Sequence, residues 1–281
     1  MTTLHFTKMH GAANDFIMID DREGLVPWED YVLMSLLATR RTGVGSEGII
    51  LIQQSKRADF RMRFLNPDGT EVDMCGNGAR CAAWFAHHIG AAPKSMTMET
   101  SCGLLDAEIV DECNVKVWMP EPSARSYGMV IHVGDERYEG DYVNTGVPHF
   151  VIRTTSPETI DIDEVGRAIR LHPAFAPEGV NVNFIAQRAP NRISMRTYER
   201  GVEAESGACG TGAVAAAITA VEAHAATLPM TIRTSGGFVL NIDSDWRANH
   251  CTGITLTGPV RKVYEGTIDL SILANDLAAI E

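Results

Sequence analysis

The sequence lacks long apolar runs, closely spaced cysteine pairs and an excess of basic residues. No apolar stretch approaches the roughly 18 residues of a membrane span, and residues 1–6 show no basic segment followed by an apolar one. The formal net charge of −12 argues against a nucleic-acid-binding surface, which would be basic. We therefore expect a globular cytoplasmic protein with neither a membrane nor a nucleic acid as partner.

The six cysteines include no Cys-x-x-Cys pair, so we expect no zinc site or other metal site. A disulfide framework is not expected in a chain of this length without a secretory signal. Four of the cysteines are interpreted as small buried hydrophobic residues, namely Cys81, Cys102, Cys113 and Cys251.

The other two cysteines, Cys75 and Cys209, each precede a Gly-polar-Gly-Ala sequence followed by helix-forming residues. This pattern predicts a sharp turn into a helix, with the sulfur at the helix N-terminus. There the thiol pKa is lowered, and unpaired N–H groups can hold an anion. A phosphate loop would require Gly-Lys-Ser/Thr, which neither copy has, so the pattern favours a carboxylate ligand.

The two motifs belong to a longer repeat. The two cysteines are separated by 134 positions, and four further matches share that offset. These place Asp15-Phe16-Ile17 over His149-Phe150-Val151, Gln53 over Gln187, Phe64-Leu65-Asn66 over Tyr198-Glu199-Arg200, and Thr100-Ser101-Cys102-Gly103 over Thr234-Ser235-Gly236-Gly237. A repeat of this length predicts two homologous halves.

Apolar periodicity and turn residues predict four helices, at residues 27–42, 76–88, 161–171 and 212–226. The last is apolar on all sides, so we expect a strongly curved sheet around it. The predicted fold is α+β, with two pseudo-symmetric domains, each a curved, mostly antiparallel sheet or barrel wrapped around a central helix. We expect residues 1–119 with 264–281 to carry Cys75 and residues 120–263 to carry Cys209. The active site would lie in the cleft between them.

Two thiols on opposite sides of one α-carbon could remove a proton from one face and return another to the other face. This arrangement indicates racemisation or epimerisation by general acid–base catalysis. The sequence shows no pyridoxal-lysine motif, and two bases need no cofactor, so none is expected.

The chain resembles the diaminopimelate epimerase family over essentially its full length. The resemblance rests on Lys8-Met9-His10-Gly11, Asn14-Asp15-Phe16, Phe64-Leu65-Asn66, Asp68-Gly69, residues 75–81, Gly146, Pro148-His149, Asn181, residues 198–201 and Ala208 to Gly212. It implies a cofactor-independent, cytoplasmic isomerase, a homodimer, that interconverts LL- and meso-diaminopimelate in lysine and peptidoglycan-precursor biosynthesis.

By position, the resemblance makes Cys75 and Cys209 the two acid–base residues. It implies that N–H groups of four residues bind the reacting carboxylate, namely Gly76, Asn77, Gly210 and Thr211. Five side chains would bind the rest of the substrate, namely Asn14, Asn66, Asn181, Glu199 and Arg200. His149 and Glu199 would support the catalytic pair.

The chain departs from the family pattern at several positions. Val147, Glu47 and Gly48 stand where many relatives have Asn, Asp and Gln, and Ser271 to Glu281 extends beyond both repeats. A second hypothesis keeps the mechanism and changes the substrate to proline or hydroxyproline, although such racemases typically carry His where Asn77 stands. A third is a non-catalytic amino-acid-binding protein, which a proton-exchange assay would distinguish.

Overall fold

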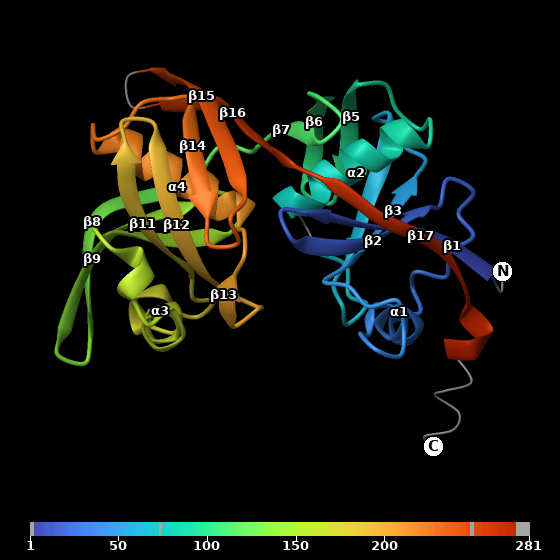
Figure 1. The fold of residues 1–281 in the computed structure, drawn as a ribbon, viewed down its shortest axis with the longest axis horizontal. Coiled ribbons are helices and arrows are strands. Elements are labelled where there is room, and N and C mark those ends of the chain that lie inside the picture. Colours follow the sequence, from blue (N-terminus) through green and yellow to red (C-terminus); the bar gives the residue numbers. More distant parts are fainter. Residues whose placement is uncertain (1–2, 73–74, 248–249, 274–281) are drawn as a thin grey trace. The chain divides into compact units, whose positions relative to one another are not determined.

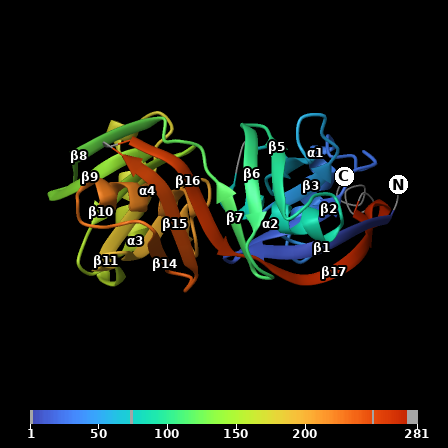
Figure 2. The same ribbon diagram turned by 90° about the horizontal axis from the view of Figure 1, so that it is seen from above.

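The computed structural model describes residues 3–72, 75–247 and 250–273. The chain divides into two compact units, one formed by Met1–Val117 with Pro259–Glu281 and the other by Trp118–Gly258. Each unit is a mixed, mainly antiparallel sheet curled around one helix (Figures 1 and 2). The predicted α+β class is confirmed.

The first unit brings the two ends of the chain together, because its last strand pairs with its first. β17 (Arg261–Asp269) runs antiparallel to β1 (Thr3–Gly11), as Figure 1 shows. The sheet continues through β2 (Asn14–Asp20), β3 (Ile49–Gln53), β4 (Phe60–Leu65), β5 (Ser95–Thr100), β6 (Gly103–Ile109) and β7 (Asn114–Trp118). Helix α2 (Gly76–His88) contacts β1, β2, β3, β4 and β6, so the sheet wraps around it.

The second unit repeats this arrangement around helix α4 (Gly210–Glu222). Its strands are ordered β8 (Ala124–Val133), β9 (Glu136–Asn144), β10 (Pro148–Arg153), β11 (Asn181–Ala189), β12 (Arg192–Glu199), β14 (Met230–Thr234), β15 (Val239–Arg247) and β16 (His250–Pro259). The short β13 (Ala204–Ser206) pairs with β12. Helix α3 (Ile162–Arg170) packs on β11 and β12, with the 3₁₀ turns η1 (Pro157–Thr159) and η2 (Pro173–Phe175) at its two ends.

The strand register and packing confirm the repeat and correct its alignment in the strands. Ile17 pairs with Ile49 on the face that packs against α1 (Tyr31–Ala38), and Phe150 pairs with Val182 on the face that packs against α3, so both positions differ by 133. In the next strand Ile49 faces Leu65 and Val182 faces Tyr198, again a difference of 133. The alignment of residues 64–66 with residues 198–200 is therefore wrong by one. Because strand side chains alternate between faces, a shift of one exchanges the two faces of the sheet.

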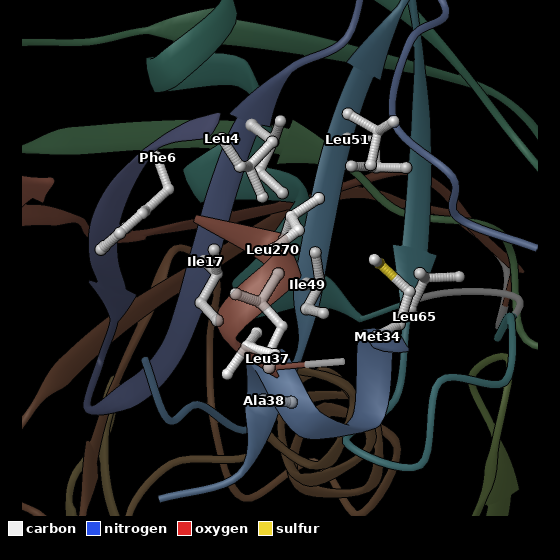
Figure 3. Packing of buried hydrophobic residues seen from close by; sticks show 13 residues of the cluster. Leu4, Phe6, Ile17, Met34, Leu37, Ala38, Ile49, Leu51, Leu65 and Leu270 are labelled. Atoms are coloured by element: carbon white, nitrogen blue, oxygen red, sulfur yellow. The ribbon is translucent and has the colours of Figure 1, made fainter. Parts of the chain in front are cut away.

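Helix α1 (Tyr31–Ala38) is shorter than the predicted helix at 27–42. Asp30 ends the preceding turn and caps α1, its carboxylate accepting from the Leu33 N–H at 3.0 Å, and Thr39 is already extended. The helix needs only its buried face, which packs on the face of the sheet opposite to α2 (Figure 3). That face comprises Met34, Leu37 and Ala38, set against Ile17, Ile49 and Leu65.

The two central helices begin at their cysteines. Cys75 and Cys209 are the N-cap residues of α2 and α4, and each helix has 13 residues. The prediction for 76–88 is confirmed, whereas α4 starts and ends earlier than the predicted 212–226. It ends at Glu222 because His224 takes a left-handed φ of 54° and the chain reverses there. The small side chains of α4 are buried almost all round, as expected.

The outcomes for the other four cysteines and for the C-terminal extension are mixed. Cys81 and Cys251 are buried as predicted, but Cys102 is exposed and Cys113 is half-buried. The extension after the repeats, Ser271 to Glu281, contributes to the core, because its Leu273 belongs to the same buried cluster as Leu270. Its residues 274–281 lie outside the described residues. No helix in the described residues is both long and apolar enough to cross a membrane.

Candidate active site

Cys75 lies at the entrance to α2 with its sulfur held by two groups of the first unit. The thiol donates to Oδ1 of Asn14 at 3.4 Å, and the sulfur accepts from the Gly78 N–H at 3.4 Å. Asn14 reaches this position because β1 and β2 are joined by a tight turn at Ala12 and Ala13, both with positive φ. The loop between these strands therefore comprises only these two residues, and Asn14 is the first residue of β2.

Charged residues surround Asn14. Its Nδ2 donates to Glu47, so its Oδ1 is left for the Cys75 thiol. Asp15 binds Lys8 and Arg40, each at 2.6 Å, and Arg40 also lies 3.9 Å from Glu47. Burial acts to raise the pKa of Asp15, but the hydrogen bonds and charges of Arg40 and Lys8 outweigh it and hold that pKa below its usual range.

The first turn of α2 is organised by a buried arginine. Arg80 is 0% exposed, and its guanidinium donates to the Gly76 carbonyl at 3.2 Å and to Oδ1 of Asn77 at 2.7 Å. The N–H groups of Gly76 and Asn77 precede the first intrahelical bond, which runs from Ala79 to the Cys75 carbonyl. These N–H groups are therefore in the position that binds an anion at a helix N-terminus.

Asn66 lies at the end of β4, where it opens a turn. Its backbone N–H donates to the Thr70 carbonyl at 2.8 Å, and its own carbonyl accepts from Gly69 at 2.9 Å. Gly69 has a φ of 84°, and a Cβ there would lie 2.3 Å from the Tyr31 carbonyl, so the turn requires glycine. The backbone of Asn66 thus belongs to this turn.

Cys209 begins α4 in a more buried setting, with 4% of its surface exposed. Its sulfur lies 3.5 Å from the hydroxyl of Thr211, and that hydroxyl lies 3.0 Å from Nε2 of His149. The other ring nitrogen, Nδ1, lies 2.8 Å from Oδ1 of Asn183. The predicted residues His149, Thr211 and Cys209 therefore form one chain of contacts.

The direction of each hydrogen bond from His149 to Cys209 follows from the contacts of Asn183. Nδ2 of Asn183 donates to Thr197 at 2.7 Å and faces the Met195 sulfur, an acceptor, at 3.6 Å. Its Oδ1 must then accept from Nδ1–H of His149. Burial lowers the pKa of His149 to about 4, against the Asn183 hydrogen bond, so the ring is neutral and Nε2 accepts from Thr211. The Thr211 oxygen is left to accept from the Cys209 thiol.

The remaining predicted residues of the second unit gather at the ends of β11 and β12. Oδ1 of Asn181 accepts from the Arg200 backbone N–H at 2.7 Å. The Arg200 guanidinium lies 3.3 Å from the carboxylate of Glu178, and its side chain is 27% exposed. Glu199 ends β12, where its carbonyl accepts from the Glu203 N–H at 2.8 Å. Asn181 thus orients the chain at the residue whose side chain carries the cation.

Sequence reasoning assigned no role to Asn183, Gly212 and Arg80. A Cβ on Gly212 would lie 2.5 Å from Nδ2 of Asn183 and 3.3 Å from the Cys209 sulfur, so this glycine lets the helix start against the buried amide. A polar residue alternating with Asn181 inside an otherwise apolar strand was the available signal for Asn183. Among the described residues no group of three or more His, Cys, Asp or Glu side chains could hold a metal ion.

Comparison with known proteins identifies close relatives along almost the whole chain. A family model described as "Diaminopimelate epimerase" matches residues 6–124 and 141–263. The diaminopimelate epimerase of Aquifex aeolicus is 39% identical over 283 residues, covering 96% of this chain and 99% of its own. That of Methanocella arvoryzae is 38% identical over 287 residues, covering 98% of this chain and 100% of its own.

Solved structures with little sequence identity share the fold. A phenazine biosynthesis protein of the PhzF family from Bacillus anthracis gives a TM-score of 0.72 at 16% identity, with 95% of this chain and 99% of that chain covered. A hydroxyproline epimerase from Agrobacterium vitis, with bound trans-4-hydroxy-L-proline, gives 0.71 at 17% identity, covering 96% and 94%.

Proposed function

The chain belongs to the diaminopimelate epimerase family, and we propose that it interconverts LL-2,6-diaminopimelate and meso-diaminopimelate in lysine and peptidoglycan-precursor biosynthesis. The observation that carries the proposal is the duplicated helix start. Each of two units with the same strand order holds a cysteine as the N-cap of its central helix. One cysteine alone could be a packing residue, whereas two equivalent ones match the two proton transfers of an epimerisation.

In the proposed mechanism the two sulfurs act on opposite faces of one α-carbon. The thiolate of one cysteine takes the α-proton, so an S–H bond forms as the C–H bond breaks and the electron pair delocalises into the carboxylate. The thiol of the other cysteine then gives its proton to the opposite face. After the reaction the first cysteine is a thiol and the second is a thiolate. Each of these two protonation states of the enzyme serves one direction of the reaction.

The proposed carboxylate site comprises the N–H groups at the two helix starts. In α2 these belong to Gly76 and Asn77, and in α4 to Gly210 and Thr211, which precede the bond from Ala213 to the Cys209 carbonyl. Each helix end adds about half a positive charge. This would stabilise the carboxylate most when it carries the extra electron density of the deprotonated α-carbon.

The distal amino-acid end of diaminopimelate needs a cation for its carboxylate and acceptors for its ammonium group. We assign the carboxylate to Arg200, whose guanidinium can bind it in a bidentate manner. Glu199, Asn14, Asn66 and Asn181 would complete the substrate contacts. The hydrogen bonds from His149 through Thr211 would set the protonation state of Cys209. Glu199 would be the second residue that supports the catalytic pair.

Three departures from the family pattern bear on specificity. Gly48 has no side chain with which to bind substrate, and a Cβ there would lie 2.3 Å from the Phe64 ring, so a larger residue requires Phe64 to move. Val147 likewise offers no amide. Glu47 binds Asn14 and would support that contact instead. We propose that the substrate remains diaminopimelate because the groups for both of its ends are otherwise present.

We further propose that the protein is a cytoplasmic homodimer that needs no cofactor. The two thiols would be prone to disulfide formation under oxidising conditions, which suits a reducing compartment. Light scattering of the purified protein would test the dimer, and a mass that stays at that of one chain at micromolar concentration would refute it.

The deciding experiment is incubation with LL-diaminopimelate in D₂O, followed by chiral separation and mass spectrometry. Thiols exchange with solvent, so the meso product should carry deuterium at the inverted α-carbon. Parallel incubations with L-proline and trans-4-hydroxy-L-proline test the alternative suggested by the Agrobacterium vitis fold neighbour. Inversion of proline but not diaminopimelate would replace the proposed substrate. Binding without any exchange would identify an amino-acid-binding protein instead.

A further inference from the structure

Arg80 is a buried cation that lacks a carboxylate partner in the described part of the chain. The side chain is fully buried, and its Nε has no hydrogen-bond partner. Its two terminal nitrogens donate only to a neutral carbonyl and a neutral amide. Burying an ion in this way is costly unless a counter-charge is supplied, and a guanidinium does not escape the cost by losing its proton.

The other cations near Cys75 differ in this respect. Lys8 and Arg40 both bind the carboxylate of Asp15, and Arg40 also approaches Glu47. Their charges are therefore largely cancelled at the site. The Cys81 thiol cannot compensate Arg80 either, because burial raises its pKa and keeps it protonated. Among the described residues, the charge of Arg80 is therefore left for the thiolate form of Cys75 and for an anion that arrives from outside.

The contacts of Arg80 direct that charge to the first turn of α2. The Gly76 carbonyl that accepts from Arg80 belongs to the same peptide group as the Asn77 N–H. Donation to the oxygen of a peptide group polarises its N–H and makes it a stronger donor. The second contact holds the Asn77 side chain by its oxygen. One guanidinium thus orients both the backbone and the side chain of the turn.

The equivalent position of the second unit holds no cation. The residue four positions after Gly76 is Arg80, and the residue four positions after Gly210 is Val214, which is buried. The two helix starts share their glycines and cysteines but not this charge. Arg80 therefore gives the first turn of α2 a buried positive charge that Val214 does not give the first turn of α4.

We propose that Arg80 is a positioning residue that makes the first turn of α2 the principal seat of the substrate's reacting carboxylate. It polarises the Gly76–Asn77 peptide group and supplies the positive charge that the carboxylate neutralises on binding. This inference rests on the proposed function for the identity of the substrate, but the charge at the α2 turn can be measured without it.

The test compares the alkylation of Cys75 by iodoacetate and by iodoacetamide, followed by peptide mass spectrometry. Both reagents attack the thiolate, so the ratio of their rates does not depend on the thiolate fraction. The ratio reports how strongly the site attracts a small carboxylate. The exposed Cys102 is an internal reference, and Val214→Ala is a matched change in the first turn of α4.

Arg80→Gln removes the charge and keeps an N–H donor, whereas Arg80→Lys keeps the charge. We expect the ratio at Cys75 to fall about fivefold or more in Arg80→Gln and to stay within about twofold of wild type in Arg80→Lys at pH 7. Neither Arg80 variant should change the ratio at Cys102. Val214→Ala should not change the ratio at Cys75. An unchanged ratio at Cys75 in a folded Arg80→Gln protein would overturn the proposal.

Arg80→Lys provides a second test that holds if Arg80→Gln does not fold. A buried lysine loses its proton more readily than a free one, whereas arginine stays charged. The ratio at Cys75 should therefore fall between about pH 6 and 10 in Arg80→Lys but stay level in wild type. A level ratio in the variant would contradict the proposed charge effect.

Turnover of LL-diaminopimelate links the charge to function. Arg80→Gln should raise KM about fivefold or more and lower kcat by a smaller factor, because the substrate carboxylate is bound before and during proton transfer. A normal KM with a lowered kcat would remove Arg80 from substrate positioning. If wild type does not turn over diaminopimelate, the proposed function fails, while the alkylation ratio still decides the charge at the α2 turn.

Discussion

Cys75 and Cys209 are equivalent residues of a duplicated unit, each the extended N-cap of a 13-residue helix enclosed by a sheet. Their surroundings nevertheless differ. Cys75 contacts an amide held by a carboxylate and lies above a buried arginine, whereas Cys209 contacts a hydroxyl held by a neutral histidine. The duplication thus produced two chemically distinct thiols.

Replacing either cysteine by serine should abolish epimerisation and leave the fold intact. Serine caps a helix well, so α2 and α4 should still form, but its hydroxyl is a far weaker acid than a thiol. We expect kcat to fall at least about a hundredfold in both directions. Chiral analysis and circular dichroism measure the two effects, and Cys102→Ser at an exposed site is the control. A single variant with near-normal turnover would refute the two-base mechanism.

Gly212→Ala should disturb the second unit at a crowded contact beside Cys209. The added Cβ would lie 2.5 Å from Nδ2 of Asn183 and 3.3 Å from Cε1 of His149. We expect a loss of about 1–3 kcal/mol in the free energy of unfolding, together with reduced turnover. Gly207→Ala is the control, because its Cβ would meet only Gly236, at 3.9 Å. Equal stability of the two variants in urea would show that the buried amide can move aside.

His149 should make the protein less stable in mild acid. The folded pKa of about 4 lies below the ordinary value of 6.5, so the unfolded chain binds a proton first as the pH falls. The stabilising effect is complete above about pH 6.5 and is lost as the pH falls through 4, for a total of up to about 3 kcal/mol. The difference in unfolding free energy between wild type and His149→Gln should shrink over this range.

Urea unfolding at several pH values measures that difference, since the contributions of other groups cancel. His132→Gln, at an exposed position of β8, should leave the profile of wild type unchanged. The unfolding free energy of wild type minus that of His149→Gln could instead stay constant from pH 7 to pH 4. That result would show that burial does not lower the pKa of His149 in the folded protein.

Arg200→Lys should mainly weaken substrate binding. A guanidinium binds a carboxylate through two parallel hydrogen bonds, which an ammonium cannot do, and losing such a contact costs about 1.5–3 kcal/mol. We expect KM to rise roughly tenfold to a hundredfold with a smaller change in kcat. Arg170→Lys is the control, since Arg170 binds Glu203 in the same unit at 2.9 Å. Unchanged kinetics in Arg200→Lys would exclude it from the site.

Leu273→Ala should destabilise the first unit although it lies beyond both repeats. Leu273 is 3% exposed and packs in the core beside α1, so its truncation should cost about 2–4 kcal/mol in unfolding free energy. The adjacent Ile272 is 59% exposed, and Ile272→Ala should change that free energy by less than about 0.5 kcal/mol. Similar melting temperatures for both variants would place the segment outside the core.

The sequence by itself determined the features that depend on short spacing. The Cys-Gly-x-Gly-Ala motifs predicted a helix after each cysteine, the offset of 134 predicted the repeat, and the apolar composition of residues 213–221 predicted a buried central helix. These signals are local because capping, glycine turns and periodicity act within a few residues. The match to the family motifs named the catalytic candidates on the same basis.

The tertiary structure alone decided which polar groups are buried and what they contact. Asn183 meets His149 from 34 positions away, and Thr211 meets the same ring from 62 positions away. Arg80 is an ordinary helix residue in the sequence, and only the enclosing sheet makes it a buried charge. The direction of a hydrogen bond and the field of an ion depend on such distant neighbours and on the exclusion of water, neither of which local spacing encodes.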